Sequence, residues 1–162
     1  MVKQKCEIDS FTASDLIADF RNQNMSVNKN VENIACNQDI LIQALEIRKS
    51  QDKEFILDGH FCLLNKSGNI ERISFITFQQ LYPEAIVLLT ENPEVIIKRR
   101  FERDGIVCAL HNIEQFQQEE KQYAIEVAHQ LNIPIFTSKG STDLEKAVEF
   151  IYTICKGELH ER

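Results

Sequence analysis

Glu54-Phe55-Ile56-Leu57-Asp58-Gly59-His60-Phe61 joins an apolar run to an abrupt Asp-Gly pair. A short apolar run of this kind predicts a fully buried strand of a parallel sheet, because such strands are covered on both faces. Open α/β sheets bind ligands in the crevice outside the carboxyl ends of their strands. The sequence therefore predicts that Asp58 delivers a carboxylate to a binding crevice.

Strand and helix patterns alternate through the rest of the chain, with no internal repeat and no linker. This alternation predicts a single α/β domain over residues 1–162, a three-layer αβα arrangement around a mostly parallel sheet. We expect strands at 7–11, 55–58, 85–90 and 133–137, and helices at about 16–20, 40–47, 75–81, 94–103, 112–131 and 144–155.

Two segments interrupt this pattern. Residues 21–38 are rich in Asn and poor in apolar groups, which favours a loop or short mobile helices that form a flap over the acceptor side of a site. Residues 61–74 place two short strand patterns around Asn65-Lys66-Ser67-Gly68-Asn69, where a glycine is free to take a positive φ. The second segment therefore predicts a hairpin inserted in the domain.

Composition narrows the classes of function. The 162 residues carry a net charge of -7, which disfavours general binding to nucleic acid. No apolar stretch approaches the length of a membrane span, and the first residues lack the apolar core of a signal peptide. Five widely spaced cysteines without a Cys-x-x-Cys pair favour reduced, mostly buried thiols. We expect a cytoplasmic protein without a membrane or nucleic-acid partner.

The Leu-Asp-Gly at 57–59 and the pair Arg99 and Arg103 before Asp104 resemble the phosphate-loop nucleotide kinases. The likeness is strongest to the adenylate-kinase-like branch, including archaeal-type adenylate kinases with Asp-x-His after the same strand. It covers about residues 6–155 in the order of elements. The resemblance implies ATP and Mg²⁺ as cofactors and phosphoryl transfer to a nucleotide or small-molecule acceptor.

The resemblance also implies roles for single residues. The aspartate at Asp58 would orient hydrated Mg²⁺ beside the phosphates. Arg99 and Arg103, four residues apart on one helix, would clamp the moving phosphoryl group, since a planar guanidinium matches phosphate oxygens. Lys139 and Gly140 resemble the loop after the last strand that packs against the ATP base.

The acceptor side departs from the family. Bacterial adenylate kinases have arginines where this sequence has Ala18 and Cys62, so two charge-assisted contacts to an acceptor monophosphate are missing. A different acceptor is expected, with Ser14, Asp15 and His60 lining its pocket.

The defining Gly-x-x-x-x-Gly-Lys-Ser/Thr loop of the family does not occur in the 162 residues. Its strand, loop and helix would precede the strand at residue 7, so the sequence reads as an N-terminally truncated kinase without its first, central strand. We expect weak or absent ATP binding by this chain, and self-association through the exposed sheet.

Each of these residues also has an ordinary structural interpretation, and these alternatives stay open. Asp58 is also suited to capping a turn with Gly59, and the arginines to a solvated face near a helix end. His60-x-Cys62 and Cys108-x-x-His111 have the spacing of zinc ligands, but neither pair has an evident mate. The alternative to a kinase-like enzyme is a non-catalytic binding or assembly module derived from such a kinase.

Overall fold

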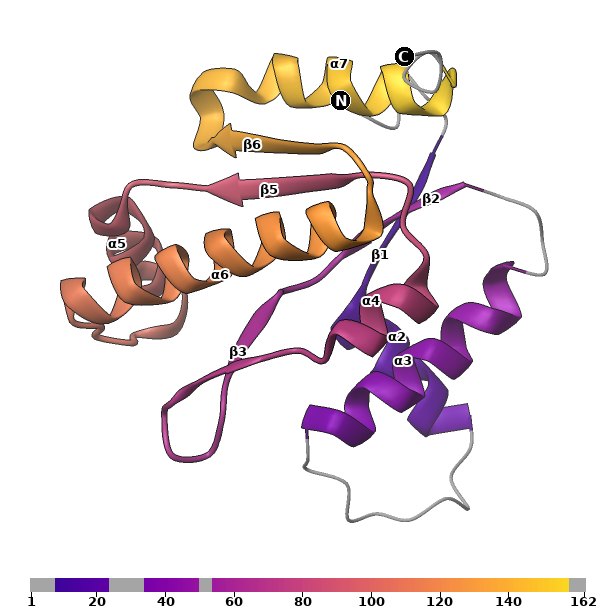
Figure 1. Ribbon diagram of the computed structural model, residues 1–162. Helices are drawn as coiled ribbons and strands as arrows, with labels where there is room; N and C mark the ends of the chain where they lie inside the picture. The colour runs from indigo at the N-terminus through magenta and orange to yellow at the C-terminus, as the bar shows by residue number, and fades with distance from the viewer. Residues whose placement is uncertain (1–7, 24–33, 50–53, 158–162) are drawn as a thin grey trace. The chain divides into compact units, whose positions relative to one another are not determined.

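The computed structural model describes residues 8–23, 34–49 and 54–157 (Figure 1). The chain divides into two compact units, Met1–Pro83 and Glu84–Arg162. Each unit contains a parallel pair of strands and helices packed on it, so the mixed α/β class is confirmed. That the two units form one domain stays a prediction.

The first unit is built on two parallel strands, β1 (Asp9–Thr12) and β2 (Phe55–Asp58). Their register pairs Thr12 with Asp58 at the carboxyl ends of both strands. The strand predicted at 55–58 is thus confirmed, but its burial was predicted wrongly. Residues 55–57 are only half-buried and Asp58 is exposed, because the described part of the chain covers this strand pair incompletely.

Two helices cover the first strand pair, α2 (Ala13–Gln23) and α3 (Ile34–Lys49). The buried side chains of Leu16, Leu41, Ala44 and Leu45 form the core between them, and Phe11 and Leu57 pack against it from the strands. Of the two alternatives for 21–38, a loop or short helices, the described ends are helical, since residues 21–23 continue α2 and 34–38 begin α3. Residues 24–33 lie outside the described part.

The predicted hairpin is confirmed. Strands β3 (Cys62–Leu64) and β4 (Ile70–Arg72) pair antiparallel, and Gly68 has a φ of 78° in the turn between them. The Asn65 side chain accepts hydrogen bonds from the N–H groups of Ser67 and Asn69, both at 3.0 Å, and so closes the turn. Helix α4 (Phe75–Leu81) follows, and its Phe78 ring stacks on Phe61 at 5.0 Å between centroids.

The second unit is built on the parallel pair β5 (Ile86–Thr90) and β6 (Ile135–Lys139). Helix α6 (Leu110–Leu131) packs on β5 and α7 (Leu144–Cys155) on β6, where Phe136 stacks on Phe150. Figure 1 shows α6 in orange on the β5 side of the pair and α7 in yellow on the β6 side. The short 3₁₀ helix η1 (Gly140–Asp143) joins β6 to α7.

Helix α5 (Pro93–Asp104) follows β5 and shows how closely local sequence determines its ends. The Asn92 side chain accepts a hydrogen bond from the Glu94 N–H at 2.8 Å, and Pro93 stands at the first helical position, where its missing N–H costs nothing. At the other end Gly105 takes a left-handed φ of 68° and donates to the Phe101 carbonyl. The predicted helix at 94–103 is confirmed.

The expected continuous sheet and the expected burial of the cysteines are only partly confirmed. In the described residues the strands form three two-stranded sheets, so the parallel pairs are confirmed while one continuous three-layer sheet stays a prediction. The four described cysteines form no disulfide with one another, but only Cys62 is buried, because the other three lie on helix faces or in a loop that reach the surface. No helix in the described ranges is long and apolar enough to cross a membrane.

Candidate functional site

The carboxyl ends of β1 and β2 form the first candidate site. Thr12 ends β1 and caps α2, since its Oγ1 accepts a hydrogen bond from the Asp15 N–H at 3.1 Å. Ser14 was a predicted substrate contact, and its Oγ lies 3.1 Å from the same Thr12 oxygen. The helix therefore begins directly at the strand ends, and it brings two hydroxyl groups and the Asp15 backbone together there.

Asp58 lies across the ladder from Thr12, exposed at the tip of β2. Gly59 and His60 follow it and are also exposed. The predicted residues Ser14, Asp15, Asp58 and His60 thus lie at one end of a single parallel strand pair, as their places in the sequence require.

This edge suits a hydrated magnesium ion better than a bare one. The described residues contain no group of three His, Cys, Asp or Glu side chains that is able to hold a metal ion. Mg²⁺ keeps several of its waters, however, and commonly binds through one carboxylate together with substrate phosphates. A single exposed aspartate at the end of a strand fits that second mode, whereas the zinc reading of the His and Cys pairs has no support in the described residues.

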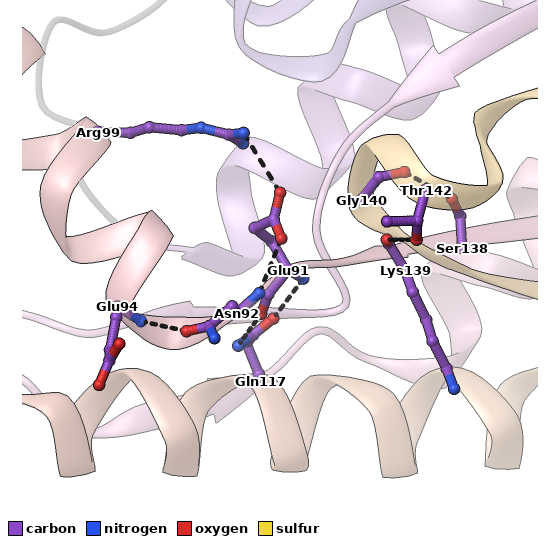
Figure 2. Close-up of polar contacts among 9 residues, drawn as sticks. All are labelled: Glu91, Asn92, Glu94, Arg99, Gln117, Ser138, Lys139, Gly140 and Thr142. Carbon is purple, nitrogen blue, oxygen red and sulfur yellow. Dashed lines mark hydrogen bonds and ion pairs between the residues drawn. The ribbon is translucent and has the colours of Figure 1, made fainter.

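The second candidate site lies in the other unit, at the carboxyl end of β5, and is centred on Glu91 (Figure 2). Its Oε1 accepts a hydrogen bond from the Asn92 N–H at 2.9 Å, and its Oε2 lies 3.3 Å from Arg99 Nη2. Its main chain is held by the Gln117 side chain of α6. That amide accepts from the Glu91 N–H at 3.1 Å and donates to the Glu91 carbonyl at 3.0 Å.

The two predicted arginines stand on α5 but meet different acidic partners. Arg99 faces Glu91, while Arg103 forms a paired contact with Asp104, whose two carboxylate oxygens accept from Nε and Nη2 at 2.6–2.9 Å. The hydrogen bonds from Arg103 hold the pKa of Asp104 below its ordinary value. Both guanidinium groups are largely exposed. Each arginine is therefore reachable from solvent and already has an anionic partner.

Lys139 is the last residue of β6 and Gly140 the first of η1, so both lie at the turn between β6 and α7 that the sequence predicted. Asp143 organises that loop, since its Oδ1 accepts from Ser138 Oγ and from the Lys139 N–H, both at 2.7 Å. The hydrogen bond from Ser138 is the largest cause that lowers the pKa of Asp143. Thr142 Oγ1 donates to the Lys139 carbonyl at 2.7 Å and closes the turn (Figure 2).

Sequence reasoning missed Glu91, Gln117 and Asp143. The rule that singled out Asp58, a carboxylate directly after a strand, also applies to Glu91 after residues 85–90. Gln117 gives no local signal, because its partner lies 26 residues earlier in the chain. Asp143 is an ordinary turn residue in the sequence, and only the fold shows that it holds Ser138 and Lys139.

A family model described as an AAA domain matches residues 1–117. That match covers well over half of the chain. The chain belongs to the AAA domain family. These domains are of the P-loop NTPase type, which agrees in kind with the resemblance to phosphate-loop nucleotide kinases. The AAA domain match includes Asp58, Glu91 and both arginines, whereas Lys139 and Gly140 lie beyond it. No curated protein matches this AAA domain chain.

Proposed function

We propose that this AAA domain protein binds ATP together with Mg²⁺ and is kinase-like, transferring a phosphoryl group to a nucleotide or small-molecule acceptor. Family membership supports nucleotide binding. The observation that carries the proposal is the pairing of Thr12 with Asp58 at the end of β2, where the carboxylate lies exposed beside the start of α2.

Asp58 is proposed to hold water molecules of a Mg²⁺ ion that arrives with the nucleotide phosphates. When bound, the ion neutralises phosphate charge as it develops during transfer. Asp58 acts here through its position and charge, because the oxygens of an exposed carboxylate accept hydrogen bonds from metal-bound water.

Arg99 and Arg103 are proposed to contact the transferring phosphoryl group. A guanidinium carries five N–H donors, so an arginine that already faces one carboxylate keeps donors for a phosphate. The exposure of both side chains supports this role. Lys139 and Gly140 are proposed to lie against the ATP base, on the strength of the resemblance alone.

Affinity for ATP is expected to be weak in this chain. Its sequence holds no Gly-x-x-x-x-Gly-Lys-Ser/Thr loop, whose backbone N–H groups and lysine supply most phosphate contacts in this class. The acceptor is proposed to contact Ser14, Asp15 and His60. Because Ala18 and Cys62 stand where related kinases have arginines, AMP is not the expected acceptor.

A non-catalytic module is the second candidate. One observation favours it: both arginines already face carboxylates, as they would in a protein that has no phosphate to bind. In that case the exposed sheet edges serve assembly with another chain or a second copy. The two candidates differ in whether MgATP has a site on the chain.

Titration of the ¹⁵N-labelled chain with MgATP separates them, since amide shifts detect even millimolar binding. The kinase-like function predicts saturable shifts at Thr12 and Asp58, and at Arg99, that require Mg²⁺. Asp58→Asn is expected to abolish the Mg²⁺ dependence, because the amide keeps the shape of the side chain and loses its charge.

Asp9→Asn is the matched control, since Asp9 is an exposed aspartate at the opposite end of the same strand pair. This variant should titrate as the parent chain does. Absence of saturable shifts up to the highest soluble MgATP concentration, or shifts that Asp58→Asn leaves unchanged, would overturn the proposed function and leave the module as the better account.

A further inference from the structure

Glu91 connects four segments of the second unit, although neither the family resemblance nor the proposed function gives it a role. It follows β5, its carboxylate meets the first turn of α5 at Asn92, and the Gln117 amide of α6 holds its main chain. Its remaining carboxylate oxygen faces Arg99 (Figure 2). The residue is thus fixed at its backbone and at one oxygen, and it presents the other oxygen to the arginine.

Gly140, at the start of η1, belongs to the fourth segment and lies close to the Glu91 carboxylate. A Cβ built on Gly140 would lie 2.6 Å from Glu91 Oε2 and 2.9 Å from its Cδ and Oε1, closer than real Cβ contacts. Gly140 also has a φ of 64°, which side chains disfavour. The Glu91 carboxylate therefore occupies the volume that a side chain at residue 140 would need.

The side chains of Glu91 and Arg99, which form the ion pair, differ in how firmly their surroundings hold them. The Glu91 side chain is 23% exposed and has contacts on several sides, whereas the Arg99 side chain is 65% exposed. In the described part of the chain only one Nη of Arg99 has a carboxylate partner. Glu91 is accordingly the fixed member and Arg99 the member that it orients.

We propose that Glu91 is a positioning residue that orders the Arg99 guanidinium, and that Gly140 is glycine so that the Glu91 carboxylate keeps this place. The consequence for nucleotide affinity rests on the proposed function. The ordering itself does not, and it is measurable without ligand. An arginine held by one Nη retains Nε and its other Nη for a phosphate, and it loses less conformational freedom when the phosphate binds.

The first test measures the order parameter of the Arg99 Nε–Hε group by ¹⁵N relaxation in the ligand-free protein, with the signal assigned through Arg99→Lys. Glu91→Gln keeps an oxygen for the Asn92 N–H and removes the charge that faces Arg99. We expect the order parameter to fall clearly in this variant. Glu94→Gln, an exposed glutamate on the first turn of the same helix, is the control and should leave it unchanged.

Gly140→Ala provides a second route to the same result. Its methyl group should displace the Glu91 carboxylate and so free Arg99, although residue 99 itself is untouched. Gly157→Ala is the matched control, because Gly157 has a similar φ of 70° but nothing within 4 Å of its built Cβ. It carries the same backbone strain without the collision, and Arg99 should stay ordered. An Arg99 order parameter equal to that of the parent in both Glu91→Gln and Gly140→Ala would overturn the proposal.

The second test is a double-mutant cycle on MgATP affinity, read from amide shifts. Glu91→Gln should weaken binding about threefold to tenfold, the size expected when one charge-assisted contact is loosened. In an Arg99→Gln background it should have no further effect, because Glu91 acts through Arg99. An equal effect in both backgrounds would contradict the positioning role. If no variant binds MgATP, the proposed function fails, while the Arg99 order parameter still decides this inference.

Discussion

Thr12 and Asp58 are partners at the last position of the β1–β2 ladder, and Thr12 at the same time caps the helix that starts there. The sequence separates the two residues by 46 positions, and the parallel register brings them side by side at the edge where α/β folds bind ligands. The residue that caps α2 is therefore also the ladder partner of the residue that carries the exposed carboxylate of β2.

Thr12→Ala tests this cap through stability. Removing the hydroxyl leaves the Asp15 N–H without its cap, so the free energy of unfolding should fall by about 1 kcal/mol. Urea denaturation followed by circular dichroism measures it. Thr12→Ser keeps the hydroxyl and should retain most of the stability. A loss as large in Thr12→Ser as in Thr12→Ala would show that the methyl group, not the cap, matters at this position.

Gln117→Ala tests how α6 holds the end of β5. The Gln117 amide satisfies both the N–H and the carbonyl of Glu91, and both contacts are partly buried. Losing them should cost about 1–3 kcal/mol in unfolding free energy. Gln118→Ala changes the adjacent, exposed glutamine to the same residue and should stay within about 0.5 kcal/mol of the parent chain. Equal losses in the two variants would mean that the Glu91 backbone is satisfied by other groups.

Asp143 makes the free energy of unfolding of the second unit change with pH in the acid range. Its folded-state pKa is lowered from the ordinary 3.8, mainly by the hydrogen bond from Ser138. A lowered pKa means that the stabilisation is fully present above that ordinary value and is lost as the pH falls below it. The stability difference between the parent chain and Asp143→Asn should therefore be constant at neutral pH and shrink below about pH 4.

Chemical denaturation at a series of pH values measures this difference. Glu145→Gln, which removes an exposed carboxylate on the first turn of α7, is the control. A difference between the parent and Asp143→Asn that persists unchanged well below the ordinary pKa would contradict the role of the ionised Asp143.

Much of the fold was predictable because local signals determine it. Asn92-Pro93 and Gly105 set the ends of α5, and Asn65 with Gly68 sets the hairpin turn. Each of these residues acts on its own neighbours, through a side-chain cap, a fixed φ or a positive φ, so the sequence alone carries the information. Asp58 was identified in the same way, from the end of an apolar run.

The start of α3 was not predictable on that basis. Asn33 and Asn37 flank residues 34–36, and asparagine is a poor helix former, so local preference did not decide between a loop and a helix there. Packing of Leu41 and Leu45 against Leu16 rewards the longer helix, and such tertiary contacts override weak propensities. The Arg21 Nη2 group donates to Asn37 Oδ1 at 2.6 Å, a contact between α2 and α3 that no local pattern reveals.

The sequence indicated where the candidate site residues lie along the chain but not which side chains they contact. Both arginines were identified through the resemblance to phosphate-loop kinases, but that Arg99 faces Glu91 and Arg103 faces Asp104 depends on side-chain directions along α5. Contacts between Glu91, Gln117 and Gly140 join segments 26 and 49 residues apart along the sequence, and only the folded chain brings them together.

Replacement of Mg²⁺ by Mn²⁺ tests the central claim most directly, because the unpaired electrons of Mn²⁺ broaden the amide signals nearest to the metal. With MnATP, the account predicts that the signals of Thr12, Asp58 and His60 disappear first, and that they persist in Asp58→Asn. Mn²⁺ without ATP controls for binding to a chain of charge -7. Broadening centred elsewhere, or broadening that Asp58→Asn leaves unchanged, would contradict the claim that Asp58 holds the metal of a bound nucleotide.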